Sequence, residues 1–149
     1  MAYVSLDSDQ IKKAHKKHKY TKEQVEQLEK CMDEKTGPLF FMKTFMKIQH
    51  PTKGELPFEP YPYQERLIEA YNSHRFSISM LPRQTGKTTC ASGYLIWYAM
   101  FKPDSQILIA AHKYAGASDI MSRVRYAYEM LPSWIKAGVT QYNRNSIEF

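Results

Sequence analysis

Nine consecutive residues near the middle of the chain have the types and spacing of a phosphate-binding loop. The stretch runs Leu81-Pro82-Arg83-Gln84-Thr85-Gly86-Lys87-Thr88-Thr89. It lies between a short apolar run typical of a buried strand and a longer apolar run typical of a helix. Glycine lets the backbone approach a phosphate closely, and the N–H groups at a helix start attract anions. The stretch therefore predicts a nucleotide site.

The residues at the end of this loop each suit a different task in holding a nucleotide. Gly86 allows the backbone to come close to the ligand, and Lys87 can reach the β and γ phosphates. The Thr88 hydroxyl is placed to ligate Mg²⁺, whereas Thr89 suits a helix start. We therefore expect ATP and Mg²⁺ as cofactors, with residues 82–89 as nucleotide contacts and Thr88 as the metal ligand.

The loop departs from the common pattern GxxxxGK[ST], because Leu81 stands where the first glycine is usual. The order of strand, loop and helix still favours nucleotide binding over an ordinary turn. Arg83 falls inside the loop, where a guanidinium can stabilise charge that develops on a transferring phosphoryl group. Arg83 and Lys87 are therefore the expected catalytic residues, and a surface arginine is the alternative for Arg83.

Around the loop, helical and strand patterns alternate. Apolar runs at 76–81 and 106–111 predict buried strands, and the runs at 87–101 and 118–130 predict helices. Helices that alternate with apolar strands predict an α/β fold with a parallel sheet. The end of the chain, from Val139 to Phe149, is typical of a hairpin.

The first third of the chain has a different, helical character. Thr21 and Gln24 have the spacing of a capping box, and Pro38 suits the first turn of a second, very apolar helix. The proline-rich residues 52–62 predict an extended connection. We expect three parts, which are a basic flexible tail at 1–20, a helical segment with a linker at 21–57, and the first part of a nucleotide-binding domain at 58–149.

The positive charge of the chain is concentrated in that tail. The formal net charge is +6, and five lysines account for most of it, at positions 12, 13, 16, 17 and 19. The tail is expected to be mobile or loosely helical, and its lysines form either a solvated face or a contact for DNA phosphates or an acidic partner. Neither a disulfide framework nor a zinc site is indicated by the two distant cysteines, Cys31 and Cys90. No apolar run is long enough to cross a bilayer.

From Phe58 to Phe149 the chain resembles the ATPase domain of the large terminase subunit of myophages, a group of tailed phages. Tyr63-Gln64 resembles the motif that contacts adenine in that family, and Arg83 takes the place of the arginine ahead of GKT. The family also has the segment AHK and a following helix that ends in LP. Here these match residues 111–113 and 131–132. The spacing of these features together is specific to the family.

This resemblance implies an incomplete P-loop NTPase fold of the RecA or helicase-like class. The implied activity is ATP-driven packaging of double-stranded DNA into the phage prohead in the host cytoplasm. The implied partners are the portal protein, the small terminase subunit and the C-terminal remainder of the terminase. Tyr63 and Gln64 would contact adenine. His112-Lys113 follows the second expected strand, and ligands of parallel α/β sheets gather at such strand ends, so a contact with DNA or the nucleotide is one interpretation and a purely structural role is the favoured one for His112.

The acidic residues that activate water in this class are not present as a motif. The resemblance places them, with the nuclease domain, beyond Phe149, so this chain alone is expected to hydrolyse little ATP. Two alternatives stay open at this point. One is a fragment of a helicase-like ATPase, and the other is a non-catalytic module that binds nucleotide or DNA.

Overall fold

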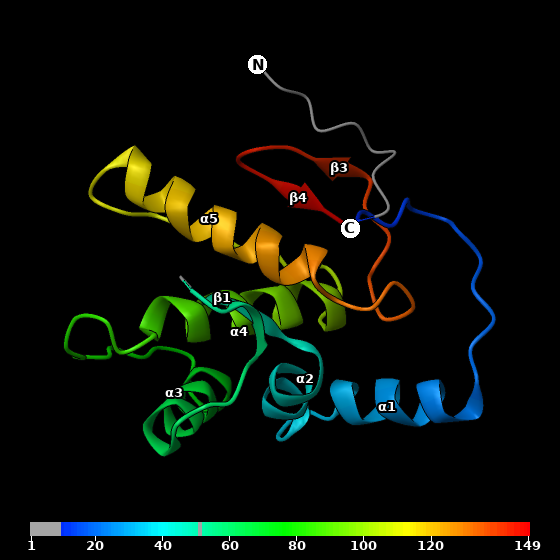
Figure 1. Ribbon diagram of the computed structural model, residues 1–149, viewed down its shortest axis with the longest axis horizontal. Helices are drawn as coiled ribbons and strands as arrows, with labels where there is room; N and C mark the ends of the chain where they lie inside the picture. Colours follow the sequence, from blue (N-terminus) through cyan, green and yellow to red (C-terminus); the bar gives the residue numbers. More distant parts are fainter. Residues whose placement is uncertain (1–9, 51) are drawn as a thin grey trace.

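The computed structural model describes residues 10–50 and 52–149, and helices dominate this part of the chain (Figure 1). The described helices are α1 (Lys22–Met32), α2 (Gly37–Phe45), α3 (Pro62–Ser73), α4 (Lys87–Phe101) and α5 (Tyr114–Glu129). The strands form two antiparallel pairs, β1 (Lys47–His50) with β2 (Gly54–Pro57) and β3 (Gln141–Tyr142) with β4 (Ile147–Glu148). The fold is therefore mixed α/β, and the expected hairpin at the end of the chain is confirmed.

Local signals fix the start of α1. The Thr21 hydroxyl accepts a hydrogen bond from the backbone N–H of Gln24, and the Gln24 side chain accepts one from the N–H of Thr21. This reciprocal pair is the expected capping box, which satisfies two N–H groups that a helix start would otherwise leave unpaired. The turn after α1 is held by Asp33, whose carboxylate accepts hydrogen bonds from Lys35 and Thr36. These bonds lower the pKa of Asp33.

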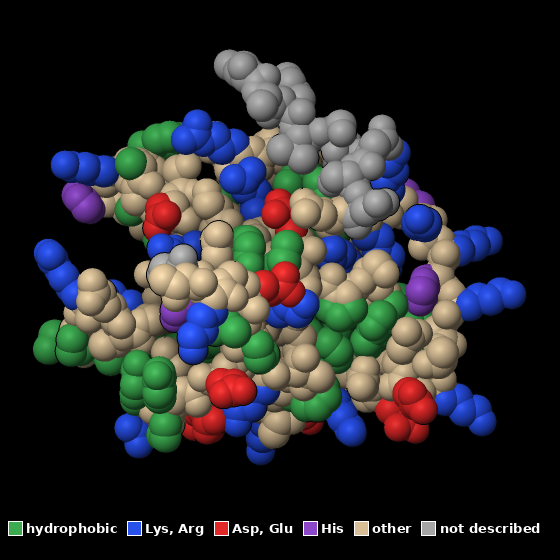
Figure 2. Space-filling model, in the orientation of Figure 1, with side chains coloured by type: hydrophobic (Ala, Val, Ile, Leu, Met, Phe, Trp, Pro, Cys, Tyr) green, Lys and Arg blue, Asp and Glu red, His purple; other side chains and the backbone are tan. Residues whose placement is uncertain are grey.

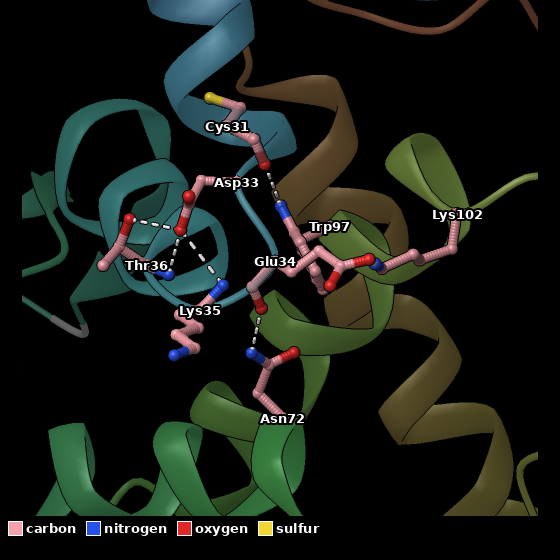
Figure 3. Close-up of polar contacts among 8 residues, drawn as sticks. All are labelled: Cys31, Asp33, Glu34, Lys35, Thr36, Asn72, Trp97 and Lys102. Atoms are coloured by element: carbon pink, nitrogen blue, oxygen red, sulfur yellow. Dashed lines mark hydrogen bonds and ion pairs between the residues drawn. The ribbon is translucent and has the colours of Figure 1, made fainter.

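The turn after α1 is also connected to α3 and α4, the helices on either side of residues 74–86 (Figure 3). Trp97 of α4 donates from Nε1 to the carbonyl oxygen of Cys31 at 2.8 Å. Asn72 of α3 donates to the carbonyl oxygen of Glu34, and Lys102 lies 3.8 Å from the Glu34 carboxylate. The N-terminal helices are thereby connected to both helices that flank the loop.

The core lies where α2 crosses α4. Phe41 and Met42 of α2 and Trp97 of α4 are fully buried. Gly93 lets the two helices approach closely, because a Cβ atom there would lie 2.5 Å from the side chains of Met42 and Met46. The helical segment at 21–57 and the region from 58 onward therefore share one hydrophobic core.

Two segments that were expected to be buried strands, residues 76–81 and 106–111, form no strand in the structure. Instead, Phe76, Ile78 and Met80 are 82%, 96% and 92% exposed. A strand of a parallel sheet needs neighbouring strands and covering helices to bury such side chains. Neither segment has a strand partner within residues 10–50 and 52–149, so the expected parallel sheet is not formed there.

Two further expectations about the first half of the chain are wrong. Residues 47–50 and 54–57 pair as β1 and β2 where the second helix was expected to continue and an extended connection to follow. Gly54, with φ of +73°, makes the tight turn between the strands possible. The expectation of a mobile or loosely helical tail fails for residues 10–14, which pack against the segment before β3. Residues 1–9 of the tail lie outside the described residues.

None of the helices in the described part of the chain combines the length and the apolar character that crossing a membrane requires.

Candidate nucleotide-binding site

The loop before α4 has the backbone of a tight turn that closes onto a helix start. Gly86 is the N-cap of α4 and has φ of +73°, in the left-handed region. Gln84 also has a positive φ, 63°, a conformation that disfavours a residue with a Cβ atom. Backbone strain of this kind is found at ligand sites more often than elsewhere. The predicted helix start at Lys87 is confirmed, whereas the strand predicted before the loop is not formed.

The first turn of α3 holds this loop by one carbonyl group. The Tyr63 hydroxyl donates to the carbonyl oxygen of Thr85 at 2.9 Å, and Gln64 Nε2 donates to the same oxygen at 3.0 Å. Gln64 Oε1 also accepts a hydrogen bond from the N–H of Tyr61 at 2.9 Å. The two residues that the family resemblance assigned to adenine therefore lie beside the loop and fix its backbone.

Gly86 is required at its position for space as well as for its φ angle. A Cβ atom built there would lie 2.5 Å from Gln64 Nε2, which is closer than real Cβ contacts come. Gln64 is buried and bonded at both ends of its amide, so its side chain has little freedom to move away. The start of α3 and the end of the loop thus fit only when residue 86 has no side chain.

Lys87 is turned back across the loop. Its Nζ donates to the carbonyl oxygen of Pro82 at 3.3 Å, and the Thr85 hydroxyl donates to the same oxygen at 3.0 Å. The Lys87 side chain is exposed, so its ammonium group is accessible to a ligand in solution. The positively charged ammonium group of Lys87 therefore lies over the turn.

The start of α4 is electrostatically suited to an anion. Gly86 has no side chain to cap the first N–H groups, and the first turn contains no acidic residue. A helix N-terminus carries partial positive charge, and Lys87 adds a full one. The local arrangement therefore favours a phosphate over a cation.

The remaining loop residues lie at different depths. Arg83 and Gln84 are exposed, whereas Thr88 is half-buried. Half-buried Thr89 lines a cavity of about 550 Å³ between β1, α4 and α5. In this cavity the buried hydroxyl of Ser92 has no hydrogen-bond partner, a feature that the sequence did not signal.

The structure does not join His112 and Lys113 to the loop. Both are exposed, and Lys113 is the N-cap of α5. No hydrogen bond or ion pair links either residue to residues 81–89. Their roles toward DNA or nucleotide stay predictions.

Acidic residues do not gather at the loop. No group of three or more His, Cys, Asp or Glu side chains that could hold a metal ion occurs among residues 10–50 and 52–149. Asp119 is paired with Arg123 at 3.3 Å, and Glu148 lies in β4. Neither of these two carboxylates lies at the start of α4, where the helix N-terminus and Lys87 are suited to an anion.

An aromatic pair beside the site was missed by sequence reasoning. The rings of Tyr61 and Tyr63 are stacked at 5.8 Å with an angle of 7° between their planes. Tyr61 is 64% exposed, so the pair presents an open ring face next to the residues that hold the loop. The signal in the sequence was Tyr-Pro-Tyr, in which Pro62 starts α3 and orders both tyrosines.

One family model matches the second half of the chain. Residues 78–149 match the family described as terminase large subunit, T4likevirus-type, N-terminal. The match covers the loop, α4, α5 and the β3–β4 hairpin. It begins after α3, so Tyr63 and Gln64 lie outside it. The resemblance that the residues indicated is confirmed for the matched stretch.

Proposed function

We propose that this chain, whose residues 78–149 match the family of T4-type terminase large subunits, is the ATP-binding part of a phage DNA-packaging motor. The substrate of the motor is double-stranded DNA, which is moved into the prohead in the host cytoplasm. The observation that carries the proposal is the closed loop ahead of α4, in which Gly86 begins the helix and the Lys87 ammonium lies over the turn. The family match and the chemistry of this site support the same function.

In this proposal the loop holds the phosphates of ATP. The N–H groups at the start of α4 and the Lys87 ammonium donate to phosphate oxygens, and the Thr88 hydroxyl ligates Mg²⁺. When bound, Mg²⁺ would offset the negative charge of the phosphates. Arg83 is exposed on the loop and supplies a guanidinium for charge that develops at the γ phosphate. The absence of a Cβ atom at Gly86 is the structural feature that lets the loop close against Gln64.

The start of α3 provides the adenine contacts in this proposal. Gln64 uses one N–H of its amide for Thr85 and has a second N–H left to donate. The exposed face of the Tyr61–Tyr63 pair is available for stacking on a base. Because Gln64 also holds the loop, adenine binding and loop geometry are coupled through one side chain.

The exposed apolar segments support a requirement for further strands. Phe76, Ile78 and Met80 alternate along one segment, and Leu108 is 91% exposed in the other. We infer that 76–81 and 106–111 become strands of the parallel sheet when another part of the terminase pairs with them. That part would also supply the acidic residues that activate water. The portal protein and the small terminase subunit are the further partners in this proposal.

The experiment that tests the motor assignment combines this chain with a polypeptide that carries the remainder of the ATPase domain. The rate of ATP hydrolysis is measured with and without duplex DNA. A DNA-stimulated rate above the sum of the separate parts supports the proposal. No gain would favour a non-catalytic nucleotide-binding module, and DNA unwinding would favour a helicase-like ATPase.

A further inference from the structure

The first described residues form a strap, residues 10–14, across the segment that precedes β3. The N–H of Val139 donates to the carbonyl oxygen of Lys12 at 2.9 Å, and the N–H of Ala14 donates to the carbonyl oxygen of Val139 at 3.2 Å. Lys13 and Val139 form a parallel bridge. Figure 1 shows this dark-blue start of the described chain beside the C-terminal end. The strap is therefore attached by backbone hydrogen bonds on both sides of Val139.

Side chains anchor the strap as well. Ile11 is buried, and the Lys136 ammonium donates to the carbonyl oxygens of Gln10 and Glu129 at 2.7 and 2.8 Å. Lys136 itself is only 5% exposed. At Gly138, a Cβ atom would lie 2.8 Å from the Ala14 Cα, so the strap lies directly against the backbone. The strap thus fills a place that is shaped for it.

Between the strap and α1 runs the basic loop, residues 15–20. His15 has φ of 60° and turns the chain away from the strap, and the capping box at Thr21 fixes the other end. All six residues are exposed. In Figure 1 the loop arches away from the remainder of the molecule, and Figure 2 shows Lys and Arg side chains projecting along that edge. The basic loop is therefore held at both ends with its side chains in solvent.

The charges of the basic loop are uncompensated by described carboxylates. Lys16, Lys17 and Lys19 form no ion pair with a carboxylate in the part of the chain that the structure describes. The sequence from residue 10 to residue 22 contains no Asp or Glu. Positive charge is thus concentrated on a short exposed arch.

We propose that the basic loop is a contact surface for the phosphate backbone of duplex DNA, with Lys16, Lys17 and Lys19 as the contacting residues. The proposal rests on the proposed function, which makes double-stranded DNA the substrate, and it specifies where this chain touches it. Lysine carries a compact charge that binds phosphate without recognising the base. The loop contains no arginine, whose planar guanidinium would favour a carboxylate partner through two parallel hydrogen bonds. A loop fixed at both ends also loses less conformational entropy on binding than a free tail.

The test measures the affinity of the chain for a fluorescent DNA duplex by anisotropy over a series of salt concentrations, without nucleotide. The variant Lys16→Gln, Lys17→Gln, Lys19→Gln is compared with a control of equal charge, Lys30→Gln, Lys35→Gln, Lys53→Gln. Each lost phosphate contact reduces the slope of log K against log salt by about 0.9, so the loop variant should lose roughly 2 to 3 units of slope. The control should keep the slope of the unmodified chain. Equal slopes for the two triple variants would overturn the proposal.

A second variant tests the anchoring. Gly138→Ala leaves every lysine in place but inserts a Cβ atom against Ala14. Faster amide exchange at Ala14 would report release of the strap, and we expect a several-fold loss of DNA affinity with it. If Gly138→Ala does not fold, Ile11→Ser releases the same strap from the other side. Release with unchanged DNA affinity would contradict the role of the anchored arch.

Two further measurements separate the possible outcomes. Labelled poly-glutamate that binds the basic loop as tightly as DNA does would overturn the assignment to DNA. The variant Lys87→Ala should keep the full salt slope, because it lies in the phosphate loop. A variant that loses nucleotide binding but keeps the normal salt slope for DNA is therefore impaired only in the phosphate loop. A variant that loses part of the salt slope but still binds nucleotide is impaired only in the basic loop.

Discussion

Gln64 donates a hydrogen bond from Nε2 to the carbonyl oxygen of Thr85 at 3.0 Å, and the two residues are 21 positions apart in the sequence. The same amide accepts from the N–H of Tyr61, so one buried side chain joins the first turn of α3 to the phosphate loop. Because both ends of the amide are engaged, movement of the loop requires movement of the helix start. The geometry of the candidate site therefore depends on a residue outside the loop.

Gln64→Ala should destabilise the fold and weaken nucleotide binding together. It removes a buried amide and leaves the N–H of Tyr61 without its partner, at a cost of about 1–3 kcal/mol. The matched control is Gln24→Ala, because Gln24 has the same place in the capping box of α1. Urea unfolding and ATP titration measure the two effects. If both variants left ATP affinity unchanged, Gln64 would be only a helix cap.

Gly86→Ala and Gly54→Ala form a pair that separates backbone strain from collision. Both glycines have φ of +73°, but nothing lies within 4 Å of a Cβ at Gly54, whereas Gln64 Nε2 lies 2.5 Å from one at Gly86. Gly54→Ala should lower the free energy of unfolding by about 1 kcal/mol, which is the cost of holding an alanine in the left-handed region. Gly86→Ala should lower the free energy of unfolding by more than this and should abolish ATP binding. Equal losses of unfolding free energy would show that the contact with Gln64 yields at little cost.

Capping and helix periodicity could be predicted from the sequence because they depend on neighbouring residues. The capping box of Thr21 and the bounds of α4 at Lys87–Phe101 agree with the expectation. The contact between Val139 and the strap could not be predicted, because it joins residues more than a hundred positions apart with no motif at either end. The apolar pattern of 76–81 indicated burial, but a pattern cannot say which element will cover it.

The candidate site shows the same division. The order Gly86-Lys87-Thr88 predicted the helix start, which follows from local backbone geometry, and its affinity for phosphate stays a prediction. The resemblance placed Tyr63 and Gln64 near a nucleotide, and the structure shows them bonded to Thr85. That carbonyl contact depends on the packing of α3 against the loop, which no spacing in the sequence encodes.

Both cysteines should be unreactive in the folded protein. Cys31 and Cys90 are fully buried, and burial raises the pKa of Cys31 to about 12 and that of Cys90 to about 11, from an ordinary value of 9.0. A raised pKa stabilises the folded state below pH 9, and this contribution is lost as the pH rises toward 11 and 12. Iodoacetamide labelling at pH 9 should therefore follow unfolding. Rapid alkylation of the native protein would contradict the buried positions.

The most direct test of the nucleotide site is calorimetric titration of the chain with Mg²⁺ and ATP. The comparison uses Lys87→Ala and, as a control, Lys53→Ala, which removes an exposed lysine beside β2. A hydrogen bond to a charged group contributes about 1.5–3 kcal/mol, so Lys87→Ala should weaken binding roughly tenfold or more while Lys53→Ala binds normally. Equal ATP affinity of Lys87→Ala and the unmodified chain would contradict the assignment of residues 81–89 as the phosphate loop.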